Sequence, residues 1–121
     1  MECIKLGDIE THFAEIVWSR EPLSTNELVK LCAEELSWKR TTTYTVLKKL
    51  CKKGIFKTEN RLVTATISKQ EFDSIRSKQF VEQVFNGSLL DFLVAFTSQR
   101  TLDNMEIYAI QNLLSQIINK T

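Results

Sequence analysis

The chain is poor in the residues that most catalytic and cofactor sites need. Its 121 residues include only three glycines, three cysteines, one proline and one histidine. Because Gly7, Gly54 and Gly87 lie far apart, a glycine-rich phosphate loop is excluded. His12 has no serine or cysteine at a recognisable catalytic spacing, and the carboxylates are scattered without a defensible pairing. The sequence therefore predicts no enzyme activity and no cofactor.

The cysteines are odd in number and widely spaced. Cys3, Cys32 and Cys51 contain no C-x-x-C pair, which argues against a disulfide framework and a thiolate metal site. Cys32 and Cys51 fall on apolar faces of expected helices, where cysteine acts as a small hydrophobe. The chain also lacks an apolar run long enough to cross a bilayer and a secretion-signal pattern. We therefore expect a cytoplasmic protein without membrane insertion.

Positive charge is concentrated in one segment, although the formal net charge of the chain is only +1. Between Lys39 and Arg61 lie eight of the 16 Lys/Arg residues but only one of the 15 acidic residues, Glu59. This segment therefore carries a net charge of +7 and the rest of the chain carries −6. Such an asymmetry is typical of a segment that meets a polyanion, attached to a body that does not.

Hydrophobic periodicity predicts two helices ahead of this basic segment. The first ends before Pro22, and its apolar positions are Ile9, Phe13, Ile16 and Val17. Ser24 and Glu27 have the spacing of a capping box that opens the second helix. The apolar stripe of this second helix consists of Leu28, Leu31, Cys32 and Leu36.

A third helix, from Trp38 to Gly54, is predicted with two unlike faces and Tyr44 at their border. Its apolar arc contains Thr43, Val46, Leu47, Leu50 and Cys51. Its opposite arc contains Thr41, Thr42, Thr45, Lys48, Lys49, Lys52 and Lys53. The alternating, β-branched sequence that follows predicts a short hairpin with Asn60 and Arg61 at its tip.

Three helices followed by a hairpin is the order of a winged helix-turn-helix domain. We therefore predict a mainly α (α+β) fold, with a DNA-binding winged helix at residues 1–68 and a three-helix dimerisation domain at residues 69–121. In the latter part, Ser68 and Glu71 form a second capping box, Gly87 breaks the helical pattern, and Thr101 is expected to cap the last helix.

The C-terminal helices are too apolar for the small core that they can build. The stretch "SLLDFLVAF" is apolar nearly all round, so it needs burial on most sides. Self-association is the simplest way to provide that burial. The predicted dimer interface consists of Leu89, Leu90, Phe92, Leu93, Phe96, Ile107, Ile110, Leu114 and Ile117.

In a helix-turn-helix the start of the recognition helix enters the major groove of DNA, where short hydroxyl side chains allow close approach. The predicted DNA contacts are Arg40, Thr41, Thr42, Tyr44, Thr45, Lys48, Lys49, Lys52, Lys57 and Arg61. Two alternatives remain open. The basic face is only solvated, or the winged helix is an interaction module that docks other proteins and does not bind DNA.

Several motifs resemble the penicillinase-repressor family of bacterial regulators (the BlaI/MecI/CopY group). They are "LGDIETHFAEIVW", "STNELVKLCAEEL", "WKRTTTYTVLKKLCKKGIF" and "ATISKQEF", and the resemblance is good over residues 6–96. It implies a homodimeric repressor that binds a palindromic operator, with a membrane sensor-protease as a further partner.

The sequence departs from that family pattern at three places. Members that answer to β-lactams are cleaved between an asparagine and a phenylalanine, and the matching position here is Ala95-Phe96. Copper-responsive members carry a cysteine-rich C-terminal motif, whereas no cysteine follows Cys51. The wing also lacks the usual glycine near its tip.

Overall fold

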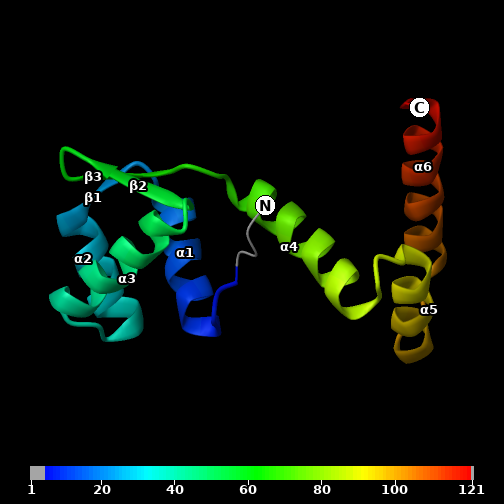
Figure 1. The fold of residues 1–121 in the computed structure, drawn as a ribbon, viewed down its shortest axis with the longest axis horizontal. Helices are drawn as coiled ribbons and strands as arrows, with labels where there is room; N and C mark the ends of the chain where they lie inside the picture. Colours follow the sequence, from blue (N-terminus) through cyan, green and yellow to red (C-terminus); the bar gives the residue numbers. More distant parts are fainter. Residues whose placement is uncertain (1–4, 121) are drawn as a thin grey trace. The chain divides into compact units, whose positions relative to one another are not determined.

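The computed structural model describes residues 5–120 (Figure 1). Over these residues it contains six helices and a three-stranded antiparallel sheet. Three helices and the sheet precede three further helices, which confirms the predicted mainly α fold with a winged helix and a helical C-terminal part. The chain forms two compact units, one up to residue 79 and one from Phe80 onward.

The first three helices are α1 (Asp8–Arg20), α2 (Thr25–Leu36) and α3 (Arg40–Lys52). Helix α2 begins as predicted, because the Ser24 hydroxyl accepts a hydrogen bond from the Glu27 N–H at 3.1 Å. Helix α3 ends at Lys52, and Gly54 follows the cap residue Lys53 with a φ of +84°, which suits the position just beyond a helix C-terminus. The Ile55 N–H then closes the end of the helix by donating to the Leu50 carbonyl at 3.1 Å.

The wing is the hairpin of β2 (Phe56–Glu59) and β3 (Leu62–Ala65), with Asn60 and Arg61 as its two-residue turn. This confirms the predicted hairpin and tip. Both turn residues have a positive φ, 52° and 63°, which matches the right-handed twist of the paired strands. A third strand, β1 (Leu23–Ser24), pairs with β3 and was not predicted, since two residues are too few to show an alternating pattern.

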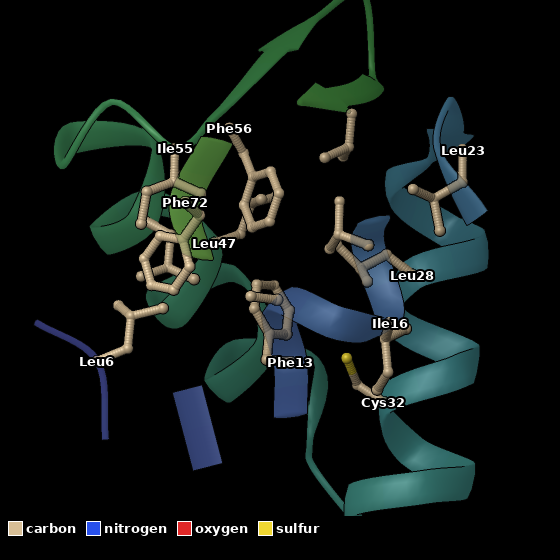
Figure 2. Packing of buried hydrophobic residues seen from close by; sticks show 14 residues of the cluster. Leu6, Phe13, Ile16, Leu23, Leu28, Cys32, Leu47, Ile55, Phe56 and Phe72 are labelled. Carbon is tan, nitrogen blue, oxygen red and sulfur yellow. The ribbon is translucent and has the colours of Figure 1, made fainter. Parts of the chain in front are cut away.

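The first unit is held together by a core of large aromatic and aliphatic side chains (Figure 2). Phe13 is fully buried and stacks on Trp38, with ring centroids 5.7 Å apart. Trp18 packs edge-on against Phe56 at 5.5 Å and donates its indole N–H to the Ile67 carbonyl at 3.0 Å. These contacts attach the segment that follows β3 to α1. Ile9 was expected on the apolar face of α1 but is 61% exposed, because it lies in the first turn, outside the core.

Beyond the wing come α4 (Lys69–Val84), α5 (Leu89–Gln99) and α6 (Asn104–Lys120). Phe72 of α4 is buried in the first core, so the division between compact units falls inside α4. The boundary predicted between DNA-binding and dimerisation domains, at residues 68 and 69, is one of function and stays a prediction. Asn86 and Gly87, both with positive φ, separate α4 from α5 as the sequence indicated.

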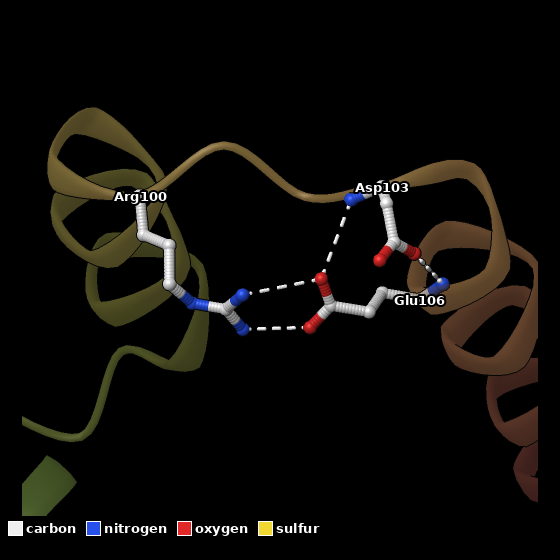
Figure 3. Close-up of polar contacts among 3 residues, drawn as sticks. All are labelled: Arg100, Asp103 and Glu106. Carbon is white, nitrogen blue, oxygen red and sulfur yellow. Dashed lines mark hydrogen bonds and ion pairs between the residues drawn. The ribbon is translucent and has the colours of Figure 1, made fainter.

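The start of α6 differs from the prediction. Asp103, and not Thr101, caps the helix, because its carboxylate accepts the Glu106 N–H at 2.8 Å. Arg100 binds the Glu106 carboxylate with both terminal nitrogens, at 3.2 and 2.6 Å (Figure 3). This exposed pair raises the pKa of Arg100 and lowers that of Glu106, in each case mainly through the hydrogen bonds between them. It therefore ties the end of α5 to the first turn of α6.

Candidate nucleic-acid interface

Helix α3 has the two unlike faces that the sequence predicted. Thr43, Leu47 and Leu50 are buried, while Val46 and Cys51 are half-buried. The ten residues predicted to contact DNA are all exposed: Arg40, Thr41, Thr42, Tyr44, Thr45, Lys48, Lys49, Lys52, Lys57 and Arg61. The helix contains no acidic residue, so its exposed front is cationic.

The front of α3 divides into a centre and two edges at a helical rotation of about 100° per residue. The centre consists of Thr41, Thr45, Lys48 and Lys52. The edge that contains Thr42, Lys49 and Lys53 contacts the N-terminal part of the chain. The opposite edge, with Arg40 and Tyr44, lies beside the wing. We call the centre and the two edges the three strips of this front.

On the first edge, two lysines already have protein partners. The Lys49 ammonium lies 2.8 Å from the Glu10 carboxylate of α1, and the Lys53 ammonium donates to the Lys5 carbonyl at 2.8 Å. The hydrogen bond from Lys49 is the main cause of a lowered Glu10 pKa, with the hydrogen bond from the Gly7 N–H second. An anion at this edge must compete with a carboxylate.

In the centre, the two lysines have no such competitor. Within residues 5–120, the ammonium groups of Lys48 and Lys52 make no ion pair or hydrogen bond with the protein. The Thr45 hydroxyl donates to the Thr41 carbonyl at 2.8 Å. It can therefore offer lone pairs and a methyl group to a base edge, which fits acceptor contacts and thymine methyl packing.

At the wing edge, the structure brings two predicted residues of α3 together with a predicted residue of the wing about twenty positions later. Arg40, Tyr44 and Arg61 line one hollow of about 500 Å³. The Arg40 guanidinium carbon lies 6.0 Å from the Tyr44 ring centroid, a distance at which the cation and the ring attract each other. The hollow is completed by Thr25, Asn26 and Thr58, which sequence reasoning missed. The capping box at Ser24 was the available signal, because helix N-termini attract anions.

Lys57 lies on the same wing but not in that hollow. It lines a different depression with Glu59, Asn60, Leu62 and Thr64, and its ammonium is 4.0 Å from the Glu59 carboxylate. Its predicted role in DNA contact stays a prediction, and its nearest charged neighbour is an acid.

The predicted dimer residues lie on helices that have no fully buried side chain in the single chain. Leu90 is 70% exposed, whereas Phe92 and Leu93 are half-buried within their own unit. The Phe92 ring contacts three other rings, those of Phe80, Phe85 and Phe96, at 5.7 to 6.1 Å. Phe92 therefore belongs to an internal aromatic cluster, and Leu90 belongs to the exposed surface.

Sequence reasoning also missed exposed apolar residues of α5 and α6, among them Val94, Leu113 and Ile118. Val94 lies one turn after Leu90 on α5. On α6, a rotation of about 100° per residue places the following residues within one arc of roughly 140°. We call this arc the α6 stripe: Ile107, Ile110, Leu113, Leu114, Ile117 and Ile118. The missed residues have the helical spacing of the predicted ones, so the same pattern search could have found them.

The Ala95-Phe96 bond lies inside α5, and both residues are exposed. The Arg100 guanidinium lies 5.1 Å from the Phe96 ring centroid. A peptide bond within a helix must unwind locally before a protease can bind it in an extended form.

Comparison with known proteins agrees with this arrangement of a winged helix and a helical C-terminal part. The family model of the penicillinase repressor matches residues 6–116. The chain belongs to the penicillinase repressor family. It is similar to the penicillinase repressor of Bacillus licheniformis, with 25% identity over 96% of this chain and 94% of the relative.

The chain is also similar to two further proteins. The methicillin resistance regulatory protein MecI of Staphylococcus aureus (strain Mu50) is 22% identical over 93% of this chain and 94% of its own length. An uncharacterised 16.5 kDa protein of Latilactobacillus sakei is 28% identical over 88% of this chain and 75% of its own. Within residues 5–120 no helix is long and apolar enough to span a membrane.

Proposed function

We propose that this protein is a homodimeric transcriptional repressor that binds a palindromic DNA operator through α3 and the wing. The observation that carries the proposal is the centre of the α3 front: hydroxyl groups and the two unpaired lysines Lys48 and Lys52, without an acidic residue, on a helix whose back is buried in the core. Family membership supports it, because the relatives are named as a penicillinase repressor and a methicillin resistance regulator.

The proposed division of labour follows from the contacts of each strip. Thr41, Thr42 and Thr45 lie near the start of α3, which is the part of a recognition helix that meets base edges. Lys48 and Lys52 follow along the same face and would contact phosphates, which set affinity rather than sequence preference. Lys49 takes part only to the extent that DNA displaces its Glu10 partner.

Dimerisation is the second part of the proposal. It is supported by the exposed apolar side chains of α5 and of the α6 stripe, which water disfavours and which a symmetric partner would cover. A dimer also presents two recognition helices to half-sites separated by about 34–36 Å, one turn of DNA. The palindromic operator follows from that symmetry.

Proteolytic inactivation, which the family resemblance implies, is the third part of the proposal. We propose that a membrane sensor-protease, if it acts on this chain, does so through a local unwinding of α5. The residue before Phe96 is alanine and not asparagine, and the bond lies within the helix between the Ser88 cap and the Arg100–Glu106 pair.

The test of DNA binding is the salt dependence of affinity for a duplex. Binding through phosphates weakens with a logarithmic slope of about −0.9 per contact on B-DNA. Replacing Lys48 and Lys52 by alanine should flatten the slope by roughly two contacts per protomer, and affinity for every sequence should fall. Lys30→Ala, on α2 and outside the predicted contacts, is the matched control. A wild-type protein whose association with DNA ignores salt would favour the protein-docking module instead.

A further inference from the structure

The hollow at the wing edge of α3 has the composition of an anion site. It is lined by two arginines, two hydroxyl-bearing threonines, a tyrosine and an asparagine: Arg40, Arg61, Thr25, Thr58, Tyr44 and Asn26. No carboxylate is among its lining residues. At about 500 Å³ it exceeds the space that one phosphate group fills, so it admits a phosphate that is still attached to a chain.

The backbone around the hollow is fixed by contacts between three elements. The Thr25 N–H, the first of α2, donates to the Arg61 carbonyl at 3.0 Å. The adjacent strands β1 and β3 are paired at Ser24 and Leu62. The tip of the wing is therefore attached to the N-terminus of α2, and Arg61 keeps its place beside α3 without a ligand.

The N-terminus of α2 adds a donor to the two guanidinium groups. In its first turn, the Thr25 N–H is bound to Arg61 and the Glu27 N–H to the Ser24 hydroxyl. Among the described residues, the Asn26 N–H has no protein acceptor, and Asn26 lines the hollow. A free amide at a helix N-terminus, next to two arginines, suits a phosphate oxygen.

We propose that this hollow is a clamp for one backbone phosphodiester of the bound duplex, held jointly by Arg40 from α3 and Arg61 from the wing. The inference rests on the proposed DNA binding and deepens it. The Asn26 N–H donates to the same phosphate, and Tyr44 orients Arg40 through the contact between its ring and the guanidinium. The clamp sets the depth and register of the threonine-bearing front of α3 in the groove, because the phosphate is held from two sides, by α3 and by the wing.

The experiment measures the salt slope of the full chain on a duplex of random sequence, for wild type, Arg40→Gln, Arg61→Gln and the double variant. If both arginines hold one phosphate, the double variant loses about one contact per protomer, a slope change of about 0.9. If they contact separate phosphates, it loses about two, a slope change of about 1.8 per protomer, and the clamp is refuted. Lys30→Gln removes one positive charge elsewhere on α2 and should leave the slope unchanged.

A second measurement separates failure of the clamp from failure of the proposed function. Amide shifts of Asn26 are followed in the full chain, first with the duplex and then with inorganic phosphate. A duplex-induced shift that Arg61→Gln removes supports the clamp, and an unmoved Asn26 amide in a protein that still binds DNA overturns it. If the wild type does not bind a duplex at all, the proposed function fails. A shift with inorganic phosphate alone would then identify a free-anion site, which contradicts the phosphodiester assignment.

Discussion

The exposed apolar surface of the C-terminal unit gives the sharpest quantitative prediction, through Leu90. Its side chain is 70% exposed in the single chain, so most of its burial must come from a partner. Fully burying a leucine is worth about 1.5–3 kcal/mol, so its uncovered part is worth about 1–2 kcal/mol. A symmetric interface contains the residue twice. Leu90→Ala should therefore weaken dimerisation by about 2–4 kcal/mol, which is roughly a 30- to 700-fold increase in the dimer dissociation constant.

Leu90 is a better probe than the neighbouring Leu93. Leu93 is half-buried in its own unit, so Leu93→Asp would place a charge among monomer contacts and mix unfolding with dissociation. Leu90→Ala should leave the helical circular dichroism of the monomer unchanged, because a mostly exposed side chain contributes little to folding of one chain.

The assay is sedimentation equilibrium over a range of protein concentrations. Met105→Ala is the matched control: Met105 is 84% exposed on α6 but lies outside the α6 stripe. We expect this variant to dissociate like the wild type. An unchanged dissociation constant for Leu90→Ala would show that Leu90 of α5 does not lie in the interface. Equal weakening by both variants would show that the loss is not specific to the predicted interface. A wild-type monomer at micromolar concentration that still binds a palindrome tightly would refute the dimer.

Three further predictions concern the winged helix. Lys49→Ala should lower the free energy of unfolding by about 0.5 kcal/mol at neutral pH, as expected for an ion pair at the surface whose lysine is 56% and whose glutamate is 18% exposed. Because the hydrogen bond from Lys49 lowers the pKa of Glu10 in the folded chain, this difference should shrink in chemical denaturation as the pH falls from the ordinary glutamate pKa through the lowered pKa of folded Glu10, where the carboxylate becomes protonated. Gly54→Ala should cost about 1 kcal/mol in thermal unfolding, because Gly54 has a φ of +84° although a Cβ would meet no atom. Thr45→Val should change the ranking of operator variants by about 1–3 kcal/mol in competition gel shifts while the salt slope stays constant.

Each of these has a result that would contradict it. A pH-independent effect of Lys49→Ala would mean that the ion pair with Glu10 does not contribute to stability. A Gly54→Ala variant as stable as wild type would show that α3 can end in another conformation. A uniform loss of affinity for all sequences on Thr45→Val would place Thr45 among the phosphate contacts and not at base edges.

Much of the winged helix was predictable because its signals are local. The capping boxes at Ser24 and Ser68, the positive-φ glycine at the end of α3 and the turn at Asn60 depend on residues within a few positions of one another. The two faces of α3 follow from helical periodicity alone. Local signals failed where two residues could serve as the same helix cap. At the start of α6 both Thr101 and Asp103 can cap, and the structure uses Asp103.

Sequence by itself thus determined the helices and the hairpin of the wing, and which face of α3 is cationic, but not the short strand β1. Only the tertiary structure decided what each cation meets. The partner of Lys49 is Glu10, about forty residues earlier, and the hollow joins Arg40 to Arg61 through a strand pairing that begins at Leu23. Such contacts depend on how helices pack and strands pair across the fold, and periodicity within one segment has no information about distances between segments. For that reason the sequence predicts a basic surface, and the fold separates its paired lysines from those free to bind a ligand.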